Sequence, residues 1–272
     1  MILQNLHTHT TFCDGRDSAE DMVKRAIELG FHSIGFSGHA KMPQYFPVYL
    51  EDEKLKAYKT ELNRLRLVYG EKIKIYTGIE YDRYSVGGTS GYDYVIGSVH
   101  YVEKDGELLD FDGSAQLAMD TIRDYYGGDG LAYARDYFHT MAGMGDAISF
   151  DIVGHFDIVS KNCEKHHLFD TECKEYKNMA LEALHAISER VNLFELNTGA
   201  ISRGYKSIPY PAPFILREMK ALGCRMVITS DCHDRRKLDA YFPEARDMLR
   251  SFGFKETYYL DKLAGGFVPQ PL

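Results

Sequence analysis

The sequence lacks two features that would point to a membrane protein or a nucleic-acid binder: a long apolar run and an excess of basic residues. No window of the 272 residues approaches the apolar length that spans a bilayer, and MILQNLHTHT at the start contains no charged segment followed by an apolar stretch. The formal net charge is -8 and the isoelectric point is about 5.8, which argues against a protein that tracks along nucleic acid. We therefore expect a cytoplasmic protein that acts on small or phosphorylated solutes, with neither a membrane nor a nucleic acid as partner.

Paired cysteines are also lacking. The five cysteines are odd in number, scattered, and never in a CxxC spacing, which favours reduced thiols in a cytosolic protein. Cys13 and Cys232 stand beside candidate metal ligands, but we expect each thiol to point away from its neighbour's target, as adjacent side chains do in a strand or a tight turn.

Short runs of β-forming residues alternate with helical segments along most of the chain. The predicted strands cover residues 2–6, 33–37, 72–79, 92–99, 149–154, 191–196 and 225–230, and the predicted helices cover 19–30, 51–70, 132–145, 171–190 and 212–223. This alternation predicts a single α/β domain over residues 1–272, with a parallel sheet that is either doubly wound or closed into a barrel.

Two segments depart from that alternation. Between Glu80 and Tyr92 the chain reads YDRYSVGGTSG, which is too short and too rich in glycine for a good crossover helix, so we expect an irregular wall at this point of a barrel. The last residues, GGFVPQPL, are expected to form a surface strap.

Histidines and carboxylates stand at the C-terminal ends of the predicted strands, the edge at which α/β sheets and barrels build active sites. Six of the eleven histidines fall there, with three carboxylates: His7, His9, Asp14, His39, Glu80, His100, His155, Asp231 and His233. His7 and His9 are two residues apart, so a strand directs both rings to one side. Imidazole and carboxylate without thiolate suit zinc, iron or manganese at an open catalytic site, and nine donors are too many for one ion. We expect two or three ions that share a bridging carboxylate.

The ordered set of HTHT with CDG, SGH, the glutamate of GIE, GSVH, GHFD and SDCH resembles the PHP family, named for polymerase and histidinol phosphatase, over residues 2–235. The resemblance implies a distorted, TIM-like (β/α)7 barrel with three divalent metal ions (Zn, Fe or Mn) at the C-terminal edge of the strands. By matching position, the first ion would be held by His7, His9, Glu80 and Asp231. Glu80 would bridge to a second ion held by His100 and His155, and the third would be held by Asp14, His39 and His233. Some family members have a histidine where this chain has Asp14, and an oxygen donor there bears on which metal is preferred.

Within that family, ELNTGAISRG at residues 195–204 resembles the stretch that histidinol phosphate phosphatases show after the sixth strand. This implies a phosphomonoesterase that hydrolyses L-histidinol phosphate in histidine biosynthesis, by attack of a metal-bridging hydroxide on phosphorus. Glu80 and Asp231 are the predicted catalytic residues, the second as the group that orients the attacking water or passes a proton. Arg203, Arg16 and Lys161 are the predicted phosphate contacts, since a guanidinium fork fits phosphate bidentately.

Three other functions remain open from the sequence. A PHP-type nucleotide phosphatase or an exonuclease acting on nucleic-acid ends would use the same metal cluster. A metallohydrolase of C–N bonds is disfavoured, because such enzymes commonly carry a carboxylated lysine and no lysine here falls at a strand end within the ligand set. A metal-binding module without catalysis predicts gaps in that set, and none is visible.

Overall fold

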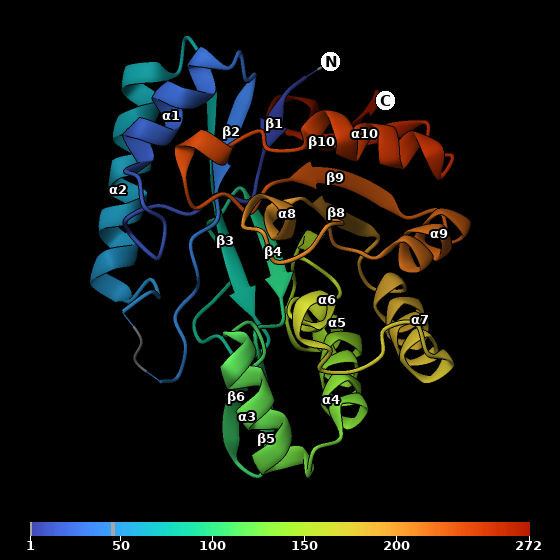
Figure 1. Cartoon of the computed structure of the whole chain (residues 1–272). Coiled ribbons are helices and arrows are strands. Elements are labelled where there is room, and N and C mark those ends of the chain that lie inside the picture. The colour runs from blue at the N-terminus through green and yellow to red at the C-terminus, as the bar shows by residue number, and fades with distance from the viewer. Residues whose placement is uncertain (1, 45–46) are drawn as a thin grey trace.

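Seven parallel strands form the central sheet in the computed structural model, which describes residues 2–44 and 47–272 (Figure 1). Their order in the sheet is β1-β2-β3-β4-β7-β8-β9. They are β1 (Gln4–Asn5), β2 (Ser33–Phe36), β3 (Lys74–Asp82), β4 (Tyr94–Ser98), β7 (Ile152–Val153), β8 (Leu193–Asn197) and β9 (Arg225–Thr229). All seven predicted strands are confirmed, with ends shifted by a few residues.

The two outer strands of this order meet and close the sheet into a barrel. A parallel bridge joins Thr8 to Cys232 just beyond the ends of β1 and β9. The amide of His9 donates to the carbonyl oxygen of Cys232 at 2.8 Å, and the amide of Cys232 donates to that of His7 at 2.9 Å. The fold is therefore the distorted (β/α)7 barrel that the family resemblance implied, and not the doubly wound sheet that the alternation of strands and helices also allowed.

Helices join most of the strands and surround the barrel (Figure 1). The five predicted helices are α1 (Ala19–Glu28), α2 (Asp52–Tyr69), α4 (Gly130–Ala142), α7 (Lys174–Ser188) and α9 (Pro213–Ala221). The sequence reading missed α3 (Ala115–Tyr126) and α10 (Phe242–Ser251), and the short helices α5 (Met144–Ala147), α6 (Cys163–His166), α8 (Gly199–Ser202), η1 (Ile158–Ser160), η2 (Arg235–Lys237) and η3 (Lys262–Ala264). The start of α1 is fixed by its N-cap, because the Ser18 hydroxyl accepts a hydrogen bond from the amide of Asp21 at 3.1 Å.

The irregular wall expected after Glu80 is confirmed. β3 and β4 pair in parallel, with Gly78 opposite Tyr94 and Asp82 opposite Ser98, although no helix connects them. The connection is held in part by the Tyr81 hydroxyl, which donates to the carbonyl oxygen of Gly87 at 2.6 Å.

Two antiparallel hairpins were not predicted. One consists of β5 (Tyr101–Lys104) and β6 (Glu107–Asp110), and the other of β10 (Glu256–Asp261) and β11 (Gly266–Pro271). The C-terminal residues lie at the surface as expected, exposed or half-buried, but they form β11 and pair with β10 along six residue pairs, which was not predicted. The second hairpin buries Leu260 against the side chains that fill the barrel.

The barrel interior is filled below the C-terminal edge of the strands. Its side chains form a separate apolar cluster: Leu6, Tyr76, Tyr94, Ile96, Ile152, Leu193, Val227 and Leu260. The Tyr94 ring takes the space that two glycines leave free, since a Cβ at Gly78 would lie 2.3 Å from Tyr94 Cζ and one at Gly35 would lie 2.5 Å from its hydroxyl. The filled barrel is a packed core, and the candidate ligands lie above it at the C-terminal rim. Within residues 2–44 and 47–272, the helices are all too short or too polar to cross a bilayer.

Candidate metal centre

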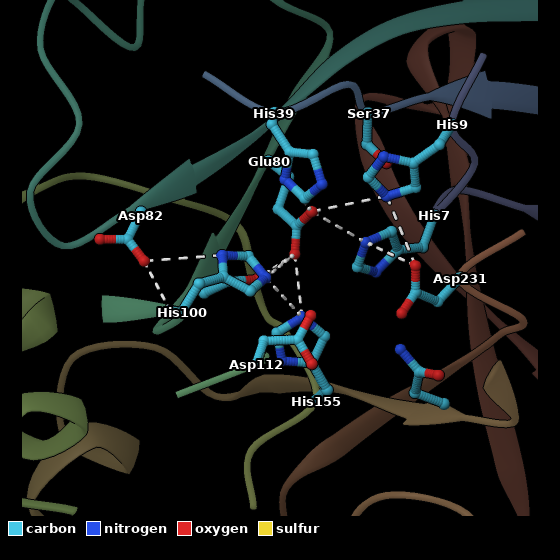
Figure 2. A network of polar contacts seen from close by, with 12 residues as sticks. His7, His9, Ser37, His39, Glu80, Asp82, His100, Asp112, His155 and Asp231 are labelled. Atoms are coloured by element: carbon cyan, nitrogen blue, oxygen red, sulfur yellow. Dashed lines mark hydrogen bonds and ion pairs between the residues drawn. The ribbon is translucent and has the colours of Figure 1, made fainter. Parts of the chain in front are cut away.

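The nine predicted ligands come together at the C-terminal edge of the barrel strands. Figure 2 shows six of them converging on Glu80, which projects from β3 into the middle of the group. His7 and His9 follow β1, Asp231 and His233 follow β9, and the other histidines follow the strands between them. Parallel strands present their C-terminal ends on one side, which is why residues as far apart in the sequence as His7 and Asp231 meet here.

The first group of donors has the spacing of a tetrahedral metal site. His7 Nε2 lies 3.3 Å from Glu80 Oε2 and 3.6 Å from Asp231 Oδ1, and His9 Nε2 lies 3.5 Å and 3.4 Å from the same two oxygens. Donors bound to one tetrahedral zinc at about 2.0–2.1 Å are separated by about 3.3 Å. The rings of His7 and His9 thus face one point, as the two-residue spacing predicted.

Glu80 has the geometry of a bridging carboxylate. Its Oε2 faces the first group and also lies 3.1 Å from His39 Nδ1. Its Oε1 lies 3.2 Å from His100 Nε2 and 2.9 Å from His155 Nε2, and those two nitrogens are 3.2 Å apart. Since the two oxygens of one side chain serve different sets of imidazoles, Glu80 can hold two ions close together.

Asp14 gathers a third group of donors. Its Oδ2 lies 3.1 Å from His233 Nε2 and 3.5 Å from His39 Nε2, and its Oδ1 lies 3.2 Å from His9 Nδ1. This set is more open to solvent than the others, because the Asp14 side chain is 32% exposed.

The expectation for Cys13 was wrong, whereas that for Cys232 was correct. Cys13 Sγ lies 3.5 Å from His9 Nδ1, because the amides of Cys13 and Gly15 both donate to the carbonyl oxygen of Thr10 and turn the chain back. The Cys232 thiol donates to the carbonyl oxygen of Asp234 and points away from the cluster.

Two further properties fit this donor set to metal ions. The buried atoms His7 Nε2, His9 Nε2 and Glu80 Oε2 have no hydrogen-bond partner, although buried polar atoms normally have one. The buried acids also remain ionised. Burial alone would raise the pKa of Glu80, but the His7, His100 and His39 imidazoles outweigh it and hold that pKa well below its usual value.

The same balance acts on the groups around it. Burial opposes ionisation of Asp231, yet the Arg203 guanidinium and His7 hold its pKa well below the ordinary value. Burial alone would lower the pKa of His7, but Glu195, Glu80 and Asp231 raise it to about 10. Protonated imidazoles and Arg203 thus balance the buried carboxylates, and divalent cations bound between the same groups would take the place of those protons.

A cavity of about 280 Å³ opens onto the cluster. It is lined by all the predicted ligands except His7 and His9, and by the three predicted phosphate contacts Arg203, Lys161 and Arg16. Arg203 Nη2 donates to Asp231 Oδ2 at 2.7 Å, and Lys161 Nζ donates to Asp112 Oδ1 at 2.7 Å. Arg16 is much more exposed and lies 3.9 Å from Asp234. The structure thus brings Arg203 into contact with a predicted ligand, places Lys161 on the wall of the same cavity and leaves Arg16 at its exposed edge.

The sequence reading missed two acidic residues of this region. Asp112 lines the cavity and follows β6, and Glu195 lies in β8 beneath the cluster, 2.9 Å from His7 Nδ1. Glu195 could have been noticed as a charge within the apolar run VNLFEL, whereas Asp112 carries no such signal.

A larger cavity, of about 720 Å³, lies between α6, α7 and α9. Its lining includes Asp157, Tyr176 and Lys206 but none of the predicted ligands. The candidate metal centre is therefore identified by its donor groups and not by its size.

Comparison with known proteins agrees with this assignment. A model of the PHP domain matches residues 5–199. The histidinol-phosphatase of Bacillus subtilis is 27% identical over 256 residues, which cover 84% of this chain and 92% of that protein. The histidinol-phosphatase of Lactococcus lactis is 24% identical over 261 residues, covering 92% and 91%. The crystal structure of histidinol phosphate phosphatase from L. lactis, complexed with zinc, L-histidinol and phosphate, superposes with a TM-score of 0.70 at 21% identity and covers 94% of this chain and 95% of that one.

Proposed function

This chain belongs to the PHP family, and we propose that it is a metal-dependent phosphomonoesterase that hydrolyses L-histidinol phosphate to L-histidinol and phosphate. The observation that carries the proposal is a cluster of imidazoles and carboxylates that shares one cavity with the basic side chains of Arg203 and Lys161. Metal ligands and phosphate-binding cations in one cavity are what a phosphomonoester dianion requires. The names of the B. subtilis and L. lactis relatives, and the L-histidinol in the L. lactis crystal structure, support the choice of substrate.

Three divalent ions, of zinc, iron or manganese, would be held by the three groups of donors. The first would take His7, His9, Glu80 and Asp231, the second Glu80, His100 and His155, and the third Asp14, His39 and His233. When bound, such ions supply a hydroxide nucleophile at neutral pH and neutralise charge on the phosphoryl oxygens.

The remaining roles fall to side chains of this chain. Arg203 lines the cavity and donates to Asp231 Oδ2 at 2.7 Å and to His233 Nδ1 at 3.0 Å, and its planar guanidinium can offer a further N–H to a phosphoryl oxygen. Lys161 adds a second positive charge on the same cavity wall. Asp231 Oδ2 is fixed by Arg203, and its low pKa keeps the group ionised. Asp231 can therefore accept a hydrogen bond from the attacking water but is a poor proton donor for the leaving alkoxide.

The size and charge of the site favour a small substrate over a nucleic-acid end. A cavity of about 280 Å³ holds one small phosphoester, and the formal net charge of -8 offers no track for a polynucleotide. Such an enzyme of amino-acid biosynthesis would act in the cytoplasm.

The test is phosphate release from L-histidinol phosphate, compared with nucleoside monophosphates, short oligonucleotides and generic phosphomonoesters. The protein used is one whose metal content per chain has been measured. Selective release from L-histidinol phosphate with close to three ions per chain is the expected result. Turnover of nucleotides alone would reject the substrate but keep the site, and a metal-free active protein would reject both. Glu80→Gln serves as the control without a bridging carboxylate, and it should lose both metal and activity.

A further inference from the structure

Glu195 is a buried carboxylate that none of the roles above uses. It lies in the middle of β8, is 1% exposed, and sits beneath the metal centre. Its Oε2 accepts hydrogen bonds from His7 Nδ1 at 2.9 Å and the Thr229 hydroxyl at 2.8 Å. Its Oε1 accepts from the amide of His155 at 2.6 Å and from Asn197 Nδ2 at 2.8 Å. Each oxygen thus receives two donors, which fills the acceptor capacity of a carboxylate.

Two of these four contacts reach different metal positions. On one side, Nδ1–H of His7 points at Glu195, so Nε2 is the nitrogen directed to Glu80 and Asp231. On the other side, the amide of His155 is held, and the His155 ring follows it toward Glu80 Oε1. We propose that Glu195 is a positioning residue that fixes His7 in the Nδ1–H form and ties the first metal position to the second through the main chain of His155. The proposal rests on the proposed metal-dependent function.

The chemistry of Glu195 follows from its four donors, and glutamine cannot replace it. Glutamine has the same shape but offers one oxygen and one NH₂ group. If its oxygen faces His7, the NH₂ group meets the donors from His155 and Asn197. If its NH₂ group faces His7, Nδ1 must accept and Nε2 must carry the proton, which removes the lone pair needed by a metal. Glu195→Gln hardly changes the shape of the side chain, but it disrupts the hydrogen bonds of the site in either orientation of the amide.

The experiment compares zinc binding by Glu195→Gln and Thr229→Val with that of the wild-type protein. Thr229→Val is the matched control, because it removes a buried hydrogen bond to the same oxygen without touching His7 or His155. Zinc is titrated against a chromophoric chelator, and zinc content and melting temperature are measured in parallel. Removing an outer partner of a metal-binding histidine typically costs 10- to 100-fold in metal affinity. We expect about that loss for the glutamine variant and less than about threefold for the valine variant.

Equal zinc affinities of the two variants, with similar losses of melting temperature, would reduce Glu195 to a structural residue and overturn the proposal. A second measurement does not depend on a variant that folds. In the zinc-loaded wild-type protein, nitrogen-15 spectra of the imidazoles should show zinc on His7 Nε2 and an exchange-protected proton on Nδ1. Zinc on Nδ1 would contradict the proposal. Neither readout requires substrate. A failure to hydrolyse L-histidinol phosphate would therefore reject the proposed function, while the zinc titration and the imidazole spectra would still decide the role of Glu195.

Discussion

Replacing Arg203 with lysine separates phosphate binding from the support of Asp231. The Arg203 side chain is 29% exposed and lines the cavity, while Nη2 donates to Asp231 Oδ2 at 2.7 Å. Lysine keeps the positive charge but replaces a planar fork by a single point of contact. The lysine ammonium can donate to Asp231 or to a phosphoryl oxygen, whereas the guanidinium of arginine can donate to both at once.

The magnitude follows from the contact that is lost. A hydrogen bond to a charged group contributes about 1.5–3 kcal/mol. If that contact is made to the phosphoryl group in the transition state, its loss lowers kcat/KM by about 10- to 150-fold. The expected result for Arg203→Lys is therefore a fall of this size with L-histidinol phosphate and little change in metal content.

The assay is steady-state phosphate release, with metal content determined on the same samples. The control is Arg123→Lys, in an exposed arginine of α3 that is paired with Asp120 and Asp124 and does not line the cavity. It should match the wild-type protein. The reasoning is refuted if Arg203→Lys keeps the wild-type kcat/KM. If kcat/KM falls only in proportion to lost metal, Arg203 serves Asp231 and does not bind phosphate.

Four further outcomes are expected. Lys161→Met removes the partner of Asp112 at the cavity wall, so we expect a several-fold higher KM and a lower melting temperature. An unchanged KM would show that Lys161 does not contact substrate. Gly78→Ala places a Cβ 2.3 Å from the Tyr94 ring, and denaturant titration should show a loss of about 1–3 kcal/mol in unfolding free energy. An unchanged unfolding free energy would mean that the ring moves aside without cost. Chelation should lower the melting temperature and abolish activity. Because the pKa of His7 is raised to about 10 without metal, zinc must displace a proton, and zinc affinity should rise between pH 6 and 8; a pH-independent affinity would contradict this.

The sequence predicted the convergence of the nine candidate ligands because the signal of each one is local to its strand. A histidine or carboxylate that follows a strand lies at the C-terminal edge whatever the sheet order, so no knowledge of long-range contacts was needed. The HTH spacing added direction, and both Nε2 atoms indeed face Glu80 Oε2. The short connection after Glu80 was predicted for a similar reason, since it depends on length and glycine content alone.

The site residues that were not predicted, Glu195 and Asp112, depend on contacts between elements that are distant in the sequence. Glu195 points inward from β8. Its contact with His7 forms only because β8 pairs with β9 and the barrel closes between β9 and β1, which His7 follows. Asp112 reaches the cavity because the β5–β6 hairpin directs the chain back toward it. That hairpin did have a local signal that the sequence reading overlooked: Asp105 and Gly106 both adopt positive φ, as the Asp-Gly pair of a tight hairpin does.

Barrel closure and metal binding involve the same few residues. β1 has only two residues, and beyond it the first and last strands of the sheet are joined by the Thr8–Cys232 bridge. The donors on either side of this bridge are His7 and His9 from one strand and Asp231 from the other, and they form the first metal group. An ion held by all three would tie residues 7–9 to residue 231 at the seam that closes the barrel. Metal binding should therefore stabilise the closed barrel as well as the site, and its loss should expose the amides of His9 and Cys232 to hydrogen exchange before those of β3 and β4.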